Sequence, residues 1–403
     1  MALQVSDQNV SARAVAVSRA VSRILSGYLE DIDYFTRENQ PGVLNFTFGD
    51  PREMAPEAYV SALQTALAPQ HEGWFAYKMY EPAAQQAAAT SLERLTGLPF
   101  EPDDILLTTG GFAALSVGMK AVADPGDEVI YSLPPWFAYE ALLVEAGLAP
   151  VKVRVDLETL DLDVDAIAAA ITPRTRIVIV NSPNNPTGRV YSPETLTRLA
   201  TALEEASARN GRRIFLLSDE PYNRIVFSGV RFRTPAEFYP YTLVAYSYGK
   251  TLLSPGQRIG YLALPPALPD REALRRAVHD LQIAIGWAFP NAVMQYALPE
   301  LEQQTFDVAR LERRRDLMVD ALTEMGYQVH RPEGTFYLFP RSPIPDDEAF
   351  ARLLAEREIL VMPGAMFETP GFFRICLTAT EETCERSLPG FAATLTNATA
   401  TVT

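Results

Sequence analysis

The sequence predicts an α/β fold, a mostly parallel sheet with helices on both faces, joined to a smaller α+β domain. Short β-branched runs alternate with segments of helical period between about residues 52 and 295. This alternation is typical of a parallel sheet with crossover helices. At 403 residues the chain can bury one large core and one smaller core. We therefore expect a large domain over 52–295 and a small domain formed by 1–51 and 296–403.

The individual elements follow from periodicity and from capping residues. Seven apolar runs are expected to be strands of the large sheet: 104–108, 128–131, 151–155, 176–180, 214–217, 243–246 and 259–264. A helix is expected over 193–210, because Ser192 can cap its first turn and Gly211 can end it. The small domain should contain a long helical stretch over 299–325, strands over 335–339 and 373–377, a helix over 346–357, a final helix and a fraying tail over 394–403.

Composition excludes several classes of partner. The net charge of −15 argues against nucleic acid and against anionic membrane, since both bind basic patches. The two cysteines, Cys376 and Cys384, and the three histidines have no metal-ligand spacing, so neither a metal site nor a disulfide framework is expected. No apolar run reaches the length of a membrane span. We expect a protein of the reducing cytoplasm.

The first 29 residues allow two interpretations. They contain three arginines and five serines but only one acid before Glu30, Asp7, a composition similar to that of a transit peptide. The favoured alternative is an amphipathic arm that packs on a partner subunit.

Lys250 is the most informative residue of the chain. An apolar strand delivers it into a turn rich in hydroxyl groups, and Arg258 follows eight positions later. A partly desolvated lysine flanked by positive charge loses proton affinity and can condense with an aldehyde. Ser247 and Arg258 offer a hydroxyl and a forked cation, which suit a phosphate dianion. An aldehyde with a phosphate describes pyridoxal phosphate, while a solvated surface lysine is the plainer alternative.

Three upstream motifs place polar groups where predicted strands end. They are Thr109-Gly-Gly-Phe112, Ser182-Pro-Asn-Asn-Pro-Thr-Gly188 and Ser218-Asp-Glu-Pro-Tyr222. Ligands bind at the carboxyl ends of strands in open α/β sheets, and free amides at a helix N-terminus bind anions. A carboxylate such as Asp219 can keep a pyridine nitrogen protonated, and a phenol such as Tyr222 can bond a phenolate oxygen. Each motif alone also fits an ordinary turn or helix cap.

Together and in this order, the motifs resemble the fold-type I pyridoxal-phosphate enzymes, and among them the aspartate-aminotransferase-like class I and II aminotransferases. The resemblance covers roughly residues 45–380. It implies that Lys250 forms the Schiff base with pyridoxal 5′-phosphate and that Asp219 pairs with the pyridine nitrogen. Tyr222 and Asn185 would contact the ring O3′, and Trp136 would stack on the ring.

The resemblance also assigns the phosphate and substrate contacts. The phosphate would be held by the backbone amides of Gly111 and Phe112 and by the side chains of Ser247 and Arg258. The substrate would meet Gly49 through its backbone, Asn185, and Arg374, which would clamp the α-carboxylate.

The implied activity is a ping-pong aminotransferase that moves an amino group from an L-amino acid to a 2-oxo acid. Lys250 would carry the α-proton, and the cofactor would accept the electrons. Two alternatives stay open, since a scaffold does not fix the reaction. One is a lyase, decarboxylase or oxidase acting on an amino acid. The other is a non-catalytic effector-binding module of a transcription regulator, against which the negative charge and the missing helix-turn-helix extension argue.

The resemblance further implies a homodimer with shared active sites. A tyrosine of the partner chain would reach the phosphate, and Tyr77 matches its position better than Tyr80. The local pattern departs from the family at Pro82, where a glycine is common. Gln86-Ala87 replace the usual Leu-Arg.

Two places in the sequence predict an apolar or aromatic substrate in preference to aspartate. Aspartate specialists of the resembled family bind the distal carboxylate with an arginine lent by the partner, in the segment that here is 283–291, or with a lysine where Phe112 stands. Neither place has a cation here, and a desolvated carboxylate without a partner is costly. Aromatic surface would come from Phe112, Tyr139, Trp287 and Phe289. In the alternative, these rings are core and Arg37 or Arg341 serves a dicarboxylate.

Overall fold

The computed structural model describes residues 9–25, 27–51, 53–304 and 307–400. Its helices are α1 Ala12–Leu25, α2 Tyr28–Asp31, α3 Tyr34–Arg37, α4 Glu57–Leu67, α5 Pro82–Thr96, α6 Gly111–Val122, α7 Tyr139–Ala146, α8 Val164–Ala170, α9 Pro193–Asn210, α10 Tyr248–Thr251, α11 Arg271–Ala284, α12 Ala292–Leu301, α13 Val308–Met325, α14 Asp347–Ala355 and α15 Glu381–Ala400. Its strands are β1 Leu44–Asn45, β2 Ile105–Thr108, β3 Glu128–Leu133, β4 Ala149–Arg154, β5 Thr175–Asn181, β6 Phe215–Asp219, β7 Thr242–Ser247, β8 Gly260–Ala263, β9 Tyr337–Leu338, β10 Ile359–Leu360, β11 Met362–Pro363 and β12 Phe373–Cys376.

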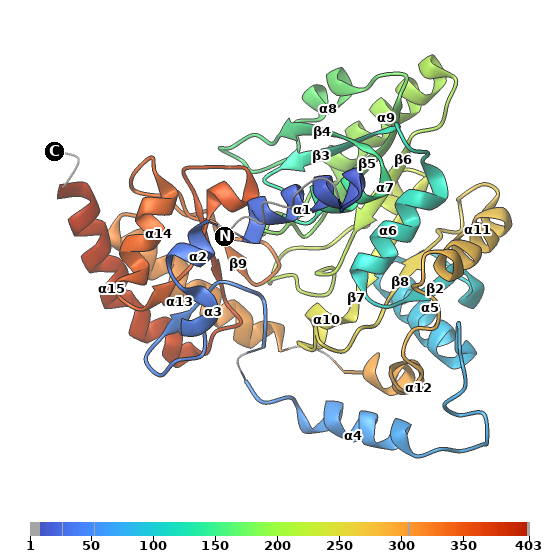
Figure 1. Cartoon of the computed structure of the whole chain (residues 1–403), viewed down its shortest axis with the longest axis horizontal. Coiled ribbons are helices and arrows are strands. Elements are labelled where there is room, and N and C mark those ends of the chain that lie inside the picture. Colours follow the sequence, from blue (N-terminus) through green and yellow to red (C-terminus); the bar gives the residue numbers. More distant parts are fainter. Residues whose placement is uncertain (1–8, 26, 52, 305–306, 401–403) are drawn as a thin grey trace.

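Among the described residues, seven strands form one large sheet in the order β2-β8-β7-β6-β5-β3-β4. Only β8 runs antiparallel to its neighbours, β2 and β7, and the other pairs are parallel. This confirms the predicted fold class. All seven predicted strands are present, with ends that differ by up to two residues. Figure 1 shows this sheet on one side of the molecule and the small unit, with β9 and α13–α15, on the other.

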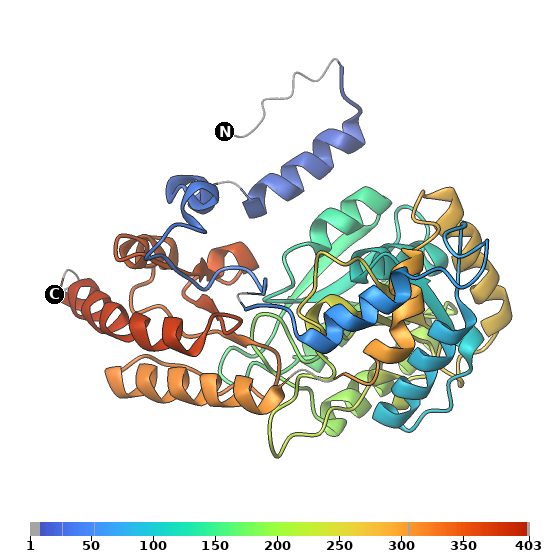
Figure 2. The same ribbon diagram turned by 90° about the horizontal axis from the view of Figure 1, so that it is seen from below.

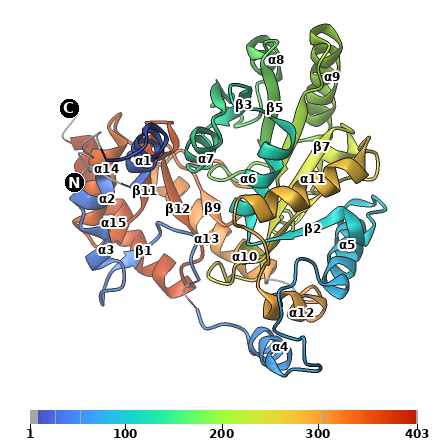
Figure 3. The same ribbon diagram turned by 45° about the vertical axis from the view of Figure 1, so that its right-hand side comes forward.

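The sheet is buried on both faces because successive residues of its strands pack on different helices. Leu106 packs in a cluster with α6, α7 and α11, whereas its neighbours Ile105 and Leu107 pack in a cluster with α4, α5 and α12. The helices α8 and α9 extend this second layer over β5 and β6. Figure 3 shows α4 beside α12 and, apart from them, α6 beside α11. Continuous apolar strands are the expected result of such two-sided burial.

Local capping signals set the ends of α9 as predicted. The Ser192 hydroxyl accepts a hydrogen bond from the Thr195 amide, and Pro193 occupies the first turn. At the other end Gly211 has φ +63, a left-handed conformation that glycine adopts without strain.

The small unit joins both ends of the chain. β1 pairs in parallel with β10, and β11, β12 and β9 form an antiparallel sheet. One core cluster contains residues 28–46 and residues 311–398 together. Figure 2 shows α13 and α15 side by side. These contacts support a division of the chain into 52–295 and 1–51 with 296–403, which we retain as a proposal.

Two expectations need correction. The stretch 299–325 is not one helix, because α12 ends at Leu301 and α13 begins at Val308, where the Asp307 side chain caps it. The expected fraying tail is helical as far as Ala400, and Thr394 is buried. The N-terminal helix α1 lies alongside α7 of its own chain, and packing of this arm on a partner subunit stays a prediction. Part of the transit-peptide interpretation falls on residues 1–8, which lie outside the described residues.

None of the helices within the described ranges is long and apolar enough to cross a membrane.

Candidate functional site

A cavity of about 200 Å³ lies where β5, β6 and β7 end and α6 and α10 begin. Nine of the residues that the sequence singled out line it: Gly111, Phe112, Trp136, Asn185, Asp219, Tyr222, Ser247, Lys250 and Arg258. The carboxyl ends of neighbouring parallel strands meet at one edge of a sheet. Residues from four distant motifs therefore meet in one place.

Asp219, the last residue of β6, is a buried carboxylate without a cationic partner in the described part of the chain. Its Oδ2 accepts a hydrogen bond of 2.5 Å from the Tyr139 hydroxyl, and the amide of Asn181 lies 3.4 Å from the same oxygen. Burial raises the pKa of Asp219 to about 7, and the bond from Tyr139 opposes this shift. The carboxylate is thus placed to gain strongly from a cation brought into the cavity.

Gly110 and Gly111 form an anion cradle at the N-terminus of α6. Gly110 has φ +92, and a Cβ atom there would lie 2.8 Å from Nη2 of Arg258. A Cβ atom on Gly111 would lie 3.2 Å from Cβ of Ser247. The two glycines therefore let backbone amides, a hydroxyl and a guanidinium approach one point closely. Arg258 is exposed and donates to the carbonyl of Pro255 at 2.7 Å, and no described carboxylate pairs with it.

Lys250 lies on α10 and is partly exposed towards the cavity. Within the described residues its amine makes no hydrogen bond or ion pair, and it lies 6.0 Å from the centre of the Phe336 ring. Burial lowers the pKa of Lys250. Four nearby side chains act more weakly, two against this shift (Cys376, Asp50) and two with it (Arg374, Arg258). The lowered pKa increases the fraction of neutral, nucleophilic amine.

Arg374 lies behind the cavity wall and contacts Asn185. It is 1% exposed, and its guanidinium donates to Oδ1 of Asn185 at 2.9 Å and to the Thr47 carbonyl at 2.6 Å. Its Nε has no hydrogen-bond partner among the described groups. A buried guanidinium with a free donor, beside an amide that lines the cavity, can still donate a hydrogen bond to an anionic ligand group.

Gly49 reaches the site through Tyr337. A Cβ atom on Gly49 would lie 2.6 Å from the Tyr337 hydroxyl, so a larger residue would not fit. The same hydroxyl lies 3.2 Å from the hydroxyl of Tyr222, which lines the cavity. The guanidinium of Arg374 lies 4.2 Å from the centre of the Tyr337 ring. Tyr337 therefore links three predicted residues that are far apart in the sequence.

Tyr77, unlike Gly49 and Arg374, has no described contact with the residues of this cavity. It is 87% exposed, and its ring packs on Phe289 with the centres 4.8 Å apart. The hydroxyl of Tyr80, by contrast, donates to Gln282 at 2.5 Å within the chain. Of the two tyrosines, Tyr77 is therefore the more exposed, and its hydroxyl is available to a partner chain.

Sequence reasoning missed two members of the site and gave a third the wrong surroundings. Asn181 and Tyr337 were not singled out; Asn181 ends β5 four residues before Asn185 and donates to the Asp219 carbonyl at 2.9 Å. Its position at a strand end was a signal that could have found it. Tyr139 was expected to offer aromatic surface to the substrate, but it is 3% exposed and its hydroxyl is bound to Asp219.

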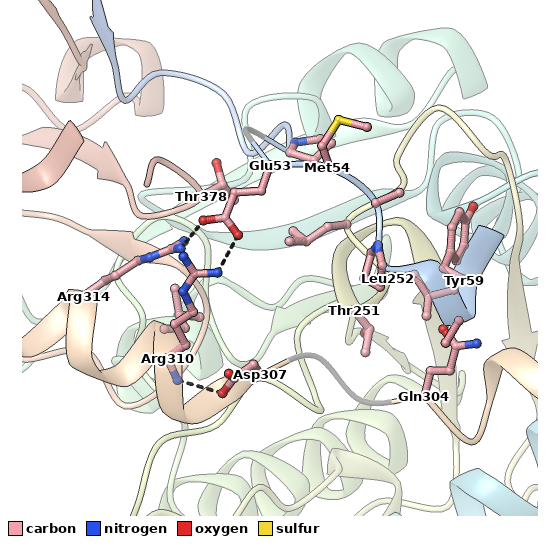
Figure 4. Close-up of a pocket in the computed structure, with 16 residues that line it drawn as sticks. Glu53, Met54, Tyr59, Thr251, Leu252, Gln304, Asp307, Arg310, Arg314 and Thr378 are labelled. Atoms are coloured by element: carbon pink, nitrogen blue, oxygen red, sulfur yellow. Dashed lines mark hydrogen bonds and ion pairs between the residues drawn. The ribbon is translucent and has the colours of Figure 1, made fainter. Parts of the chain in front are cut away.

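A larger cavity, of about 460 Å³, lies at the two chain segments that connect the large sheet with the small unit. Figure 4 shows the Glu53 carboxylate between Arg310 and Arg314, with the Asp307 side chain bonded to the backbone of Arg310. The remaining wall is mostly apolar, with Leu252 among its residues. It contains none of the residues that the sequence singled out.

Known proteins resemble this chain over most of its length. The family model "Aminotransferase class I and II" matches residues 41–389. The chain is 34% identical over 365 residues to an aspartate/prephenate aminotransferase of Thermus thermophilus, covering 87% of this chain and 90% of that protein. It is 31% identical over 379 residues to an aspartate aminotransferase of Rhizobium meliloti, covering 89% and 90%.

Solved structures agree with these relatives. A crystal structure of an aminotransferase from Eubacterium rectale superposes with a TM-score of 0.89 at 30% identity, covering 96% of this chain and 99% of that chain. An aspartate aminotransferase of Thermus thermophilus with maleate superposes with a TM-score of 0.80 at 30% identity, covering 93% and 98%.

Proposed function

This chain belongs to the class I and II aminotransferases, and we propose that its 200 Å³ cavity holds pyridoxal 5′-phosphate for the transfer of an amino group from an L-amino acid to a 2-oxo acid. One observation carries the proposal. Lys250, an uncompensated Asp219 and the glycine cradle with Arg258 all line the same cavity.

The residues present suit this cofactor. Asp219 has a pKa raised to about 7 by burial, which a cationic pyridinium would reverse. The amides at Gly111 and Phe112, the Ser247 hydroxyl and the Arg258 guanidinium suit a phosphate. When bound, pyridoxal phosphate supplies an aldehyde that condenses with amines and a ring that accepts the electrons of the α-carbon. Trp136 lies in the same wall and offers a ring face for stacking.

The chain's own residues would then divide the work. Lys250, with its lowered pKa, would bind the cofactor aldehyde before the substrate arrives. It would then move the proton at the substrate α-carbon. Tyr222 and Asn185 hydrogen-bond the phenolate oxygen of the ring. Arg374 binds the α-carboxylate in a two-pronged fashion, which orients the bond that breaks, and Gly49 leaves room for the substrate beside Tyr337.

We further propose a homodimer in which each subunit lends Tyr77 to the phosphate of its partner. The 87% exposure of Tyr77 supports this, as does the exposure of Phe289, on which its ring packs. Lys250→Ala mixed with Tyr77→Ala should regain activity through one intact hybrid site, whereas Lys250→Ala mixed with Arg258→Ala should not. A monomer by light scattering would contradict the proposal. A cytoplasmic location also remains a proposal, consistent with two free cysteines.

For the substrate we propose an apolar or aromatic amino acid. Phe112 lines the cavity, is 43% exposed and packs edge-on against Trp136 at 4.6 Å. The two arginines considered as alternative partners for a dicarboxylate are engaged elsewhere: Arg37 pairs with Glu358 at 2.8 Å and Arg341 with Glu158 at 2.6 Å. Several relatives carry aspartate in their names, so the comparison with aspartate is the decisive one.

A panel of amino donors against 2-oxoglutarate and pyruvate tests the function. Each effective donor should bleach the absorbance of the bound cofactor in a single turnover, and a 2-oxo acid should restore it. A lyase, decarboxylase or oxidase would not need the 2-oxo acid. A preference for aspartate of about tenfold or more in kcat/KM, worth ~1.4 kcal/mol, would overturn the substrate proposal.

A further inference from the structure

A largely buried ion pair joins the loop after β6, which carries Tyr222, to the end of α12. The Arg224 guanidinium and the Glu302 carboxylate make two parallel bonds of 2.7 and 3.1 Å. Their side chains are 18% and 5% exposed. Arg224 follows Tyr222 by two residues, and Glu302 is the C-cap of α12, where the chain leaves the large sheet for the small unit. Paired, largely desolvated groups of this kind have few alternative geometries.

The pair is extended to the Lys250 turn by a tyrosine. The Tyr248 hydroxyl donates to the same Oε1 of Glu302, and Tyr248 begins α10, two residues before Lys250. The Arg224 guanidinium also lies 5.0 Å from the ring centre of Tyr246 and 5.8 Å from that of Tyr248. Three segments thus converge on one carboxylate: the loop after β6, the Lys250 turn and the end of α12.

We propose that Arg224, Glu302 and Tyr248 are positioning residues for the amino transfer, because their network fixes the backbone of the Lys250 turn against the loop that carries Tyr222. None of the three lines the cavity, so they act through Lys250 and Tyr222. The inference rests on the proposed role of Lys250. It goes beyond that role because it assigns a positioning function to three residues outside the cavity, near the connection to the small unit.

A loosened turn should change the titration of Lys250 in a known direction. The groups that act on its amine are Asp50, Arg258, Arg374 and Cys376. None of these four groups belongs to the network, so loss of the network changes none of these charges directly. Burial is the main cause of the lowered pKa, and a turn that admits water relieves it. The pH midpoint should therefore move upwards.

Tyr261 supplies a matched control. It packs in the same cluster, 4.9 Å from Tyr246 and 5.9 Å from Tyr248 between ring centres, and is fully buried. Its hydroxyl has no hydrogen-bond partner among the described residues. Tyr261→Phe and Tyr248→Phe each remove one buried hydroxyl from one ring cluster. Only the second change cuts the network.

The experiment measures, by absorbance, how the rate at which the cofactor-free protein condenses with pyridoxal phosphate depends on pH, because this rate reports the neutral fraction of the Lys250 amine. Thermal unfolding of the cofactor-free protein is a second readout. We expect Tyr248→Phe to raise the pH midpoint by roughly half a unit or more and to lower kcat about tenfold with KM nearly unchanged. Tyr261→Phe should leave the midpoint and kcat as in the wild type. The double variant Arg224→Met with Glu302→Leu, which replaces the pair by apolar groups of similar size, should reproduce the Tyr248→Phe midpoint.

The outcomes separate this inference from the function on which it rests. A Tyr248→Phe midpoint equal to that of Tyr261→Phe would overturn the inference alone, even if Tyr248→Phe unfolds at a lower temperature. A wild-type protein that does not condense with pyridoxal phosphate, or a Lys250→Ala variant that condenses with the same pH dependence, would overturn the proposed function and this inference with it.

Discussion

The candidate cavity of about 200 Å³ and the cavity of about 460 Å³ beside the connecting segments differ in whether their charged groups already have partners within the chain. In the larger one, at the connection between the two units, Glu53 bonds both Arg310 and Arg314. In the smaller one, Lys250 has no ion-pair partner among the described residues and Asp219 is buried without a cation. Charges at the larger cavity already satisfy one another, whereas those at the smaller cavity would be satisfied by a ligand.

Unpaired charged groups, and not volume, are therefore our reason for proposing the smaller cavity as the site. A buried carboxylate without a cation costs free energy of folding, and the fold retains it only where something compensates. A cofactor with a pyridinium and a phosphate would compensate both Asp219 and Arg258. An ion pair that is already complete gives no comparable gain on binding a ligand.

The largest effect should come from Lys250→Ala. Without its amine, proton transfer at the substrate α-carbon loses its carrier, and we expect kcat to fall by about 10⁴-fold or more. The protein should still bind pyridoxal phosphate through the phosphate cradle, as measured by equilibrium dialysis. Turnover near that of the wild type would show that Lys250 is not needed for the reaction. It would also contradict the assignment of the smaller cavity as the site.

A smaller but large effect should follow from Asp219→Asn. An amide of the same shape cannot hold a pyridinium nitrogen protonated by charge, so kcat/KM should fall about 100-fold or more. The same variant should make the cofactor-free protein more stable, because it removes an uncompensated buried carboxylate. Activity and thermal unfolding measured on one preparation test both signs. A variant that loses activity and stability together would contradict this reasoning.

Glu220→Gln tests the buried carboxyl next to Asp219, directly after the end of β6. Glu220 is fully buried, accepts hydrogen bonds from Ser218 at 2.7 Å and from Thr234 at 2.5 Å, and burial raises its pKa from 4.5 to about 7. A raised carboxyl pKa means that the folded state binds the proton more tightly. The cost of ionisation therefore grows as pH rises from about 4.5 to 7 and is fully present above about 7.

Glutamine removes this cost, so the variant should be stabilised by roughly 1–3 kcal/mol at about pH 8 and by clearly less at about pH 5. The Oδ1 of Asn223 has no partner among the described groups. If the Asn223 amide rotates, this oxygen can accept a hydrogen bond from the new side-chain NH2. Urea unfolding of the cofactor-free protein at both pH values is the measurement. An equal change at the two pH values would show that ionisation of Glu220 is not the cause.

The smallest effect should come from Glu53→Gln at the larger cavity. Its pair with Arg310 is partly exposed, at 31% and 42%, and such pairs contribute little. Its second partner, Arg314, is only 5% exposed, but glutamine keeps an oxygen that can accept a hydrogen bond from that guanidinium. We expect about 1 kcal/mol of lost stability and kcat/KM within about threefold of the wild type. A loss of activity comparable to that of Asp219→Asn would show that the larger cavity takes part in the reaction.

The sequence by itself determined the strands, the caps and the motifs at the strand ends. Ser192 and Gly211 set the two ends of α9 through contacts within a few residues. The alternation of strand and helix segments was sufficient to predict the class of fold. Lys250, Asp219 and Asn185 could be placed together because neighbouring parallel strands end at one edge. Even their chemistry was legible, since an amine, a carboxylate and an amide each have few uses at such an edge.

Only the tertiary structure decided which side chains these residues touch. Tyr139 proved to bond Asp219, Tyr337 to stand between Gly49 and Tyr222, and Glu302 to pair with Arg224 from 78 positions away. Such contacts depend on strand register, helix rotation and the break between α12 and α13, none of which a local pattern specifies. Periodicity reports which face of an element is buried, and only packing determines which partner a buried polar group finds there.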